Sequence, residues 1–184
     1  ADVSDVVVPI EWPCYLPAWE IEPKKNFDTR PFELFFNWGL SNVLRPAFAA
    51  QTYQLMAKGK IDVIAHFECL DAKLHEPHRK WISIHSPHTH RTNINEIARR
   101  QAQSKMCVSL PGAGVKCFRS TEHLVHTAPV KLFDGMAWSH PWVHGENCIE
   151  LVSTDGMANT VYEHGTLEAL HGIYVAAQDL ADRY

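Results

Sequence analysis

The stretch PFELFFNWGLSNVLRPAFAA, residues 31–50, joins a dense apolar run to a turn and a helix start. The aromatic and large aliphatic side chains between positions 32 and 40 are Phe32, Leu34, Phe35, Phe36, Trp38 and Leu40. Gly39 can turn the chain, and Ser41 or Asn42 can cap a helix that follows. The stretch therefore predicts a buried strand and then a helical turn. Because a residue that precedes proline disfavours the α region, we expect Pro46 to interrupt the helix, with a second short piece after it.

Length and charge narrow the class of protein. The chain has 184 residues, a formal net charge of -4 and a pI near 6.3. This length fits one domain, 1–184, that can bury a core without metal or disulfide staples. The acidic balance argues against a broad nucleic-acid-binding face. Five cysteines with no CxxC pattern favour buried, reduced thiols. No apolar run is long enough to cross a membrane, and no signal-peptide pattern is present.

Short strands dominate the predicted elements. Alternation of apolar and polar residues over 60–70 predicts a half-buried strand, and 80–86 repeats the pattern. Residues 92–103 form the best helix candidate, because Thr92 or Asn93 can cap it and Arg99 and Arg100 lie near its end. Further strands are predicted at 105–110, 115–119, 123–126, 130–133 and 147–153.

The segment 166–176 fits two periods. Leu167, Leu170 and Tyr174 match a helical face, whereas Leu167, Ala169 and His171 match strand alternation. Gly172 weakens both patterns, and we interpret the segment as a strand. With no alternating strand–helix units in view, the chain is predicted to be all-β: a single antiparallel, eight-stranded jelly-roll sandwich with one or two short helices. The proline-rich residues 1–30 would form an extended arm, and 177–184 a tail.

Histidines offer one candidate metal site. His88 and His90 are two residues apart, so on a strand both imidazoles would point to one side and reach one metal ion. This pair resembles the HxH motif of cupin-type enzymes, but Glu96 lies further along than the cupin spacing and the second half of that motif is missing. A solvated polar loop is the favoured interpretation, and a metal-dependent cupin-like enzyme that uses His88 and His90 is the alternative.

The segment Ser41–Ala47, SNVLRPA, resembles a motif in the small coat proteins of comovirus- and fabavirus-like plant viruses. In that family the motif lies between two strands of a jelly roll, and here it lies between the strands predicted at 32–38 and 60–70. The tryptophans Trp138 and Trp142 before the aliphatic run Ile149–Val152 are similar to a second segment of the family. The resemblance assigns a family-motif and packing segment to Ser41, Asn42, Leu44 and Arg45.

The resemblance implies a structural, non-enzymatic protein, the small coat subunit of an icosahedral plant virus, released from a polyprotein. It implies a larger coat protein and further copies of the chain around a symmetry axis as partners, a possible contact with viral RNA, and no membrane. Trp138 and Trp142 would anchor the interfaces between subunits. The chain would be found in the virion, and in the host cytoplasm during assembly. No cofactor and no metal are expected on this interpretation. A binding module without catalysis is a third interpretation.

Overall fold

The structure, a computed structural model, describes residues 26–39, 44–58, 63–68, 94–111, 123, 125–132, 140–152, 156–163 and 166–183. These residues form strands and helices in alternation along much of the chain. In sequence order the elements are η3 (Phe27–Thr29), β1 (Phe32–Gly39), α1 (Leu44–Ala57), β2 (Val63–Glu68), α3 (Ile94–Ala102), β3 (Ser104–Ser109), β4 (Ala128–Leu132), β5 (Ile149–Leu151), α5 (Met157–Glu163) and α6 (Leu167–Ala181).

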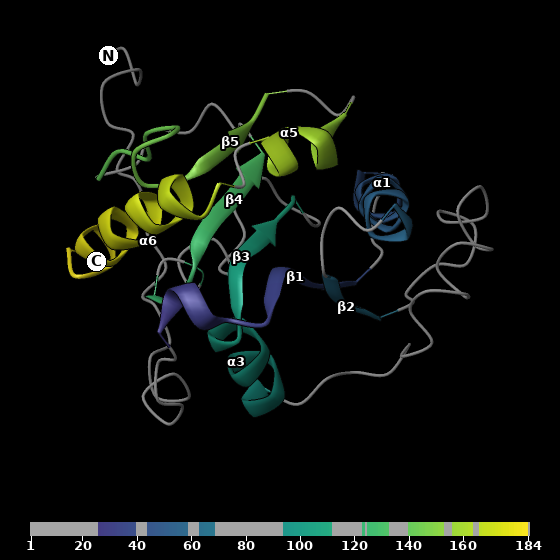
Figure 1. Ribbon diagram of the computed structural model, residues 1–184, viewed down its shortest axis with the longest axis horizontal. Coiled ribbons are helices and arrows are strands. Elements are labelled where there is room, and N and C mark those ends of the chain that lie inside the picture. The colour runs from purple at the N-terminus through teal and green to yellow at the C-terminus, as the bar shows by residue number, and fades with distance from the viewer. Residues whose placement is uncertain are drawn as a thin grey trace, which may run out of the picture.

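The strands form one five-stranded sheet in the order β2-β1-β3-β4-β5. Every pairing in it is parallel. The register places Leu34 of β1 beside Val63 of β2 on one side and beside Met106 of β3 on the other. Parallel neighbours need a crossover connection, and α1 supplies one between β1 and β2. Figure 1 shows the sheet running between α6, α5 and α1 and the separate helix α3.

Strand β1 is buried on both faces, and this places the layers. Leu34 and Phe36 belong to the main core, which they share with residues of α1, α5 and α6. Phe35 points to the opposite face, where it packs with Ile97 of α3 and Cys107 of β3. Side chains alternate across a strand, so helices that contact odd and even positions lie on opposite faces of the sheet. The protein is therefore a three-layer α/β domain in which α1 and α3 cover opposite faces.

Helix α1 is continuous through Pro46. The proline lies in the first turn, where its missing amide has no intrahelical acceptor to lose, so a helix tolerates it there. Phe48 packs edge-on against Phe36 with ring centroids 5.7 Å apart. The strand and the helix start predicted from residues 31–50 are confirmed, but the predicted interruption at Pro46 is wrong.

The predicted all-β jelly roll is wrong, because the described sheet is entirely parallel and helices cover it. Strands expected near 60–70, 105–110, 130–133 and 147–153 and the helix near 92–103 are confirmed, with bounds that differ by one to three residues at each end. The strand expected at 123–126 is wrong, since the described residues there are helical. The strand expected at 166–176 is also wrong, because helix α6 occupies it. The strands expected at 80–86 and 115–119 lie outside the described residues.

Two predicted extended segments contribute to the folded body where the structure describes them. Phe27 of η3 is 3% exposed and belongs to the main core, although 1–30 was predicted as an arm. Ala177 and Leu180 are buried in the last turns of α6, although 177–184 was predicted as a tail. No described helix is long and apolar enough to cross a membrane.

Candidate functional site at the carboxyl ends of β1 and β3

The order of the strands reverses at the middle of the sheet. From β1 the chain crosses to β2 on one side, and it later returns through α3 to β3 on the other side. The connections at the carboxyl ends of β1 and β3 therefore lead away from each other, and α1 and α3 cover opposite faces. In open parallel sheets this reversal leaves a crevice outside the carboxyl ends of the two strands, which is where such folds bind ligands. Gly39 ends β1 and Ser109 ends β3 at this edge.

Arg45 connects the two sides of the reversal. Its side chain lies in the first turn of α1 and is 7% exposed. Nη2 donates a hydrogen bond to the carbonyl oxygen of Leu110 at 3.0 Å, and Nε donates one to that of Pro111 at 3.0 Å. Both acceptors lie directly after β3. Arg45 therefore holds the backbone that leaves β3 against the start of the helix that follows β1.

The sequence motif is only partly described. Of the four residues assigned to it, Ser41 and Asn42 lie outside the described residues, Leu44 is half-buried, and Arg45 is buried. The described part of the motif, from Leu44 on, lies in the first turn of α1, at the end of the helix that borders the crevice edge. The family resemblance assigned this segment to packing in a jelly roll. Its position at the reversal of strand order in a parallel sheet was not predicted. The near-continuous apolar run of β1 was the available signal, since it is typical of strands buried on both faces.

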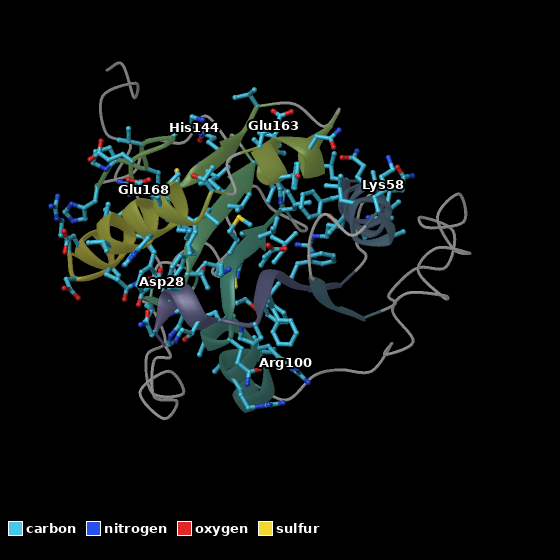
Figure 2. The ribbon with its side chains drawn as sticks, viewed as in Figure 1. Asp28, Lys58, Arg100, His144, Glu163 and Glu168 are labelled. Carbon is cyan, nitrogen blue, oxygen red and sulfur yellow. The ribbon has the colours of Figure 1, made fainter. Side chains whose placement is uncertain are left out.

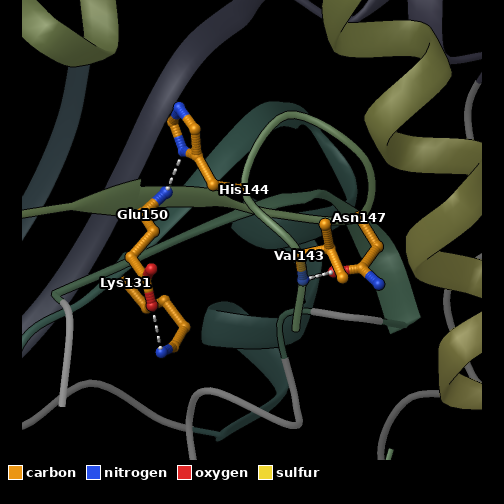
Figure 3. Close-up of polar contacts among 5 residues, drawn as sticks. All are labelled: Lys131, Val143, His144, Asn147 and Glu150. Carbon is orange, nitrogen blue, oxygen red and sulfur yellow. Dashed lines mark hydrogen bonds and ion pairs between the residues drawn. The ribbon is translucent and has the colours of Figure 1, made fainter. Parts of the chain in front are cut away.

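A buried charged pair lies further along the same sheet, between β4 and β5 (Figure 3). Nζ of Lys131 is 2.9 Å from Oε1 of Glu150, and the two residues are partners in the strand register. The Lys131 side chain is 4% exposed and that of Glu150 is 18% exposed. The backbone amide of Glu150 also donates to Nδ1 of His144 at 2.9 Å. Each of the paired residues is the penultimate residue of its strand, so the pair orders the sheet just below its carboxyl edge.

Trp142 packs within the molecule. The tryptophan is half-buried and packs against the cluster of Ala177 and Leu180 in α6, and Nζ of Lys131 lies 5.8 Å from its ring centroid. The interface role that the sequence assigned to Trp142 stays a prediction, and Trp138 lies outside the described residues.

The histidine pair His88 and His90 lies outside the described residues. Among the residues that the structure describes, no group of three or more His, Cys, Asp or Glu side chains could hold a metal ion. A cupin-like enzyme also requires a jelly roll, and the parallel sheet removes that scaffold.

Arg30 lies at the opposite edge of the sheet, where the amino ends of β3 and β4 are. The central carbon of its guanidinium lies 5.0 and 4.9 Å from the ring centroids of Phe27 and Tyr174, which stack on each other with their centroids 4.7 Å apart. Nη1 donates to the carbonyl oxygen of Ser104, at the start of β3, and to that of His126, just before β4. Burial lowers the pKa of Arg30, because removal from water disfavours the charged guanidinium. Arg30 thus fastens η3, α6 and the amino ends of two strands, and this edge has a structural role.

Neither a protein-family model nor a curated protein matches the chain. Among solved structures, the chain is similar to the C-terminal domain of a glycosyl transferase group 1 family protein (LpcC) from Francisella tularensis. The TM-score is 0.58 and the sequence identity is 15%, and the match covers 82% of this chain and 85% of that chain. At this identity the likeness establishes the fold, which is a Rossmann-like parallel α/β domain.

The likeness corrects the family resemblance drawn from SNVLRPA. A viral small coat protein of that family is a jelly roll, whereas this chain has an entirely parallel sheet and matches a parallel α/β domain in fold, so the predicted capsid function is wrong. The prediction that the chain is not an enzyme is contradicted by the same match, because the matched domain belongs to a transferase. The large coat protein, the symmetric copies, the RNA contact and the virion location followed only from that resemblance. Nothing in the structure tests them.

Proposed function

We propose that the chain is the donor-binding α/β domain of a sugar transferase and that it binds a nucleotide-activated sugar at the carboxyl ends of β1 and β3. The observation that carries the proposal is the reversal of strand order at β1 and β3, with Arg45 fixing the backbone after β3 to the first turn of α1. Doubly wound sheets bind nucleotides at such a reversal. The likeness to a glycosyl transferase domain supports sugar transfer as the reaction.

The chemistry of sugar transfer suits this edge. An oxygen of the acceptor attacks the anomeric carbon of the donor sugar, the bond from that carbon to the phosphate oxygen breaks, and the diphosphate leaves with the bonding electrons. The amino end of α1 faces the same edge, and a helix amino end stabilises a phosphate through its free amides and its dipole. The leaving diphosphate is the part of the donor that this domain would hold.

Titration of the chain with UDP, GDP and ADP, followed by calorimetry, tests the proposal. We expect at least one of these diphosphates to bind and the corresponding nucleoside to bind at least about tenfold more weakly, since the phosphates carry the contact. The variant Leu44→Glu places a carboxylate in the first turn of α1, where it favours the helix but repels a phosphate. The matched control Gln54→Glu adds the same charge at the other end of α1.

We expect Leu44→Glu to weaken diphosphate binding about tenfold or more while its thermal stability stays within about 1 kcal/mol of the parent. Gln54→Glu should bind like the parent chain. Absence of binding by all three diphosphates, or equal weakening by both variants, would reject donor binding at this edge.

A further inference from the structure

Strand β5 lies at the edge of the sheet, and the turn that precedes it occupies its outer side. In the part of the chain that the structure describes, β4 is the only strand beside β5. Such an edge leaves the backbone amides and carbonyl oxygens of alternate residues unpaired unless another segment covers them. Residues 143–148 fold back on themselves, since the amides of Glu146 and Asn147 both donate to the carbonyl oxygen of Val143. An isolated parallel bridge joins His144 to Cys148, so the turn covers the outer edge of β5.

Two backbone groups on the outer edge of β5 are bonded to this turn. The carbonyl oxygen of Cys148 accepts a hydrogen bond from the backbone amide of Gly145 at 2.8 Å. Two residues further on, the backbone amide of Glu150 donates to Nδ1 of His144 at 2.9 Å (Figure 3). In a pair of strands a backbone carbonyl oxygen would accept this second bond. An imidazole nitrogen takes its place here, and we call the bond from Glu150 to His144 the β5 cap.

The turn that carries His144 is ordered by bonds of its own. The backbone amide of Val143 donates to Oδ1 of Asn147 at 2.8 Å, and Nδ2 of Asn147 donates to the carbonyl oxygen of Pro141 at 3.1 Å (Figure 3). Gly145 has a φ of 77°, which glycine adopts without strain. None of these features involves the imidazole. The turn therefore keeps its shape whether or not His144 accepts the bond from Glu150.

The β5 cap requires a neutral imidazole. A neutral ring has one donor and one acceptor nitrogen, so acceptance at Nδ1 of His144 places the proton on Nε2. In the imidazolium both nitrogens are donors, and the N–H at Nδ1 would then face the N–H of Glu150. Two donors cannot share a hydrogen bond, so the charged ring must turn away from β5. His144 is exposed, so protons from the solvent reach it.

The charged groups described around the turn have both signs. On the strands, Nζ of Lys131 lies 2.9 Å from Oε1 of Glu150. The other charged groups near the turn line a hollow between it and the end of α6, and they are Glu146, Asp179 and Arg183. Because Lys131 already binds the carboxylate of Glu150, protonation of His144 breaks the bond to the backbone amide of Glu150 and leaves this ion pair in place.

We infer that His144 is a pH-sensitive cap on the outer edge of β5, closed at neutral pH and open in acid. Because the bond needs the neutral ring, its contribution to stability is present at pH 7.5 and is lost as the pH falls. An ordinary imidazole gains its proton near pH 6.5, so the cap opens within the range that cells use for pH signals. Opening presents the amide of Glu150 at a sheet edge, where such a group can pair with another strand.

The cap is independent of the proposed donor site. It lies on β5, whereas the donor edge is formed by the ends of β1 and β3. Figure 2 shows His144 apart from Lys58, at the carboxyl end of α1, and from Arg100 in α3.

Hydrogen exchange of single amides, followed by NMR on the ¹⁵N-labelled chain, tests the inference. We expect the protection factor of the Glu150 amide to fall at least about fivefold between pH 7.5 and pH 5.5, which is the effect of losing one hydrogen bond. The amide of Val130, in the buried strand β4, should stay within about twofold. The ¹⁵N shifts of the His144 ring should place its proton on Nε2 at pH 7.5.

Two variants of His144 separate the bond from its titration. His144→Asn places an amide oxygen where Nδ1 lies, and this oxygen accepts a hydrogen bond but does not titrate. Its Glu150 amide should therefore keep the same protection, within about twofold, at both pH values. His144→Phe keeps a ring without an acceptor, so protection should be low at both pH values. The matched control is His140→Asn, the same exchange at the histidine four residues earlier, which should keep the acid response of the parent.

Four results would overturn the inference. These are protection of the Glu150 amide that does not change with pH, an acid response that persists in His144→Asn, a proton on Nδ1 of His144 at pH 7.5, and an equal fall in protection at Val130. The last result would mean that acid unfolds the sheet as a whole. Because no nucleotide takes part in these measurements, failure here leaves the proposed donor site standing, and the converse also holds.

Discussion

Nη2 of Arg45 donates a hydrogen bond to the carbonyl oxygen of Leu110 at 3.0 Å, across 65 residues of sequence. Arg45 lies in the first turn of α1, the helix that follows β1, and Leu110 comes directly after β3. The bond therefore crosses the point at which strand order reverses. Arginine suits this position because its planar group can serve two neighbouring carbonyl oxygens at once, which a lysine ammonium does less well.

Replacement of Arg45 by glutamine should destabilise the chain and loosen the proposed donor site together. Two carbonyl groups, that of buried Leu110 and that of half-buried Pro111, lose a charged donor. Each unsatisfied group costs about 1–3 kcal/mol, so we expect a loss of about 2–4 kcal/mol in the free energy of unfolding. Urea denaturation measures the loss, and diphosphate titration measures the site. Lys58→Gln, at the exposed carboxyl end of α1, is the matched control and should change neither quantity by more than about 0.5 kcal/mol.

The pair of Lys131 and Glu150 predicts an asymmetry between two truncations. Glu150→Leu leaves an ammonium that is 4% exposed without its carboxylate, whereas Lys131→Met leaves a carboxylate that is 18% exposed and closer to water. We expect Glu150→Leu to cost about 3–5 kcal/mol and Lys131→Met to cost clearly less. The double variant should recover most of the loss, because an apolar pair can replace a buried ion pair. Equal costs for the single variants, measured by chemical denaturation, would contradict this account.

Part of the fold could be predicted from local pattern. The run from Phe32 to Trp38 predicted a strand correctly, and the alternation near Val63 and the caps before Ile94 predicted β2 and α3. Strand direction was not encoded in those patterns. The informative feature was that Leu34 and Phe35, adjacent in sequence, are both buried, because a half-solvated antiparallel sheet would expose one of them.

The continuous helix α1 and the helix α6 were not predicted, because single residues in each argued against a helix. Pro46 argued against a continuous α1, although a first-turn proline costs a helix little. Gly172 and the alternation of Leu167, Ala169 and His171 favoured a strand where α6 forms. The buried positions of α6, Leu170, Ile173, Ala177 and Leu180, have the spacing of a helix.

The sequence drew attention to the segment that borders the candidate site, but it did not predict the site itself. Ser41–Ala47 was singled out, but its role depends on Leu110 and Pro111, which only the parallel sheet brings beside Arg45. Periodicity within either segment contains no information on that pairing. A reading of residues 31–68 as a strand–helix–strand unit would have placed the end of β1 at a ligand edge.

The planar guanidinium of Arg30 contacts two aromatic rings, so we predict that a positive charge alone at position 30 does not preserve the stability of the chain. Arg30→Lys keeps the charge, but an ammonium cannot contact the stacked rings of Phe27 and Tyr174 with a planar group while it bonds the carbonyl oxygens of Ser104 and His126. We expect Arg30→Lys and Arg30→Met each to lower the free energy of unfolding by about 2–4 kcal/mol. Arg183→Lys, at an exposed arginine beyond α6, is the control. If Arg30→Lys is as stable as the parent, the planar contact contributes little.

Two glycines predict opposite effects of the same substitution. Gly172 lies inside α6, is exposed, and an added methyl group would meet nothing within 4 Å, so Gly172→Ala should stabilise the chain by about 0.5–1 kcal/mol through helix propensity. Gly145 also has open space around it, but its φ of 77° lies in the left-handed region, so Gly145→Ala should destabilise by about 1 kcal/mol. Thermal denaturation of the two variants beside the parent measures both signs. Gly145→Asn should fall between Gly145→Ala and the parent, because asparagine tolerates that conformation better than alanine does. Destabilisation by Gly172→Ala would mean that the outer face of α6 is not open at this position as described.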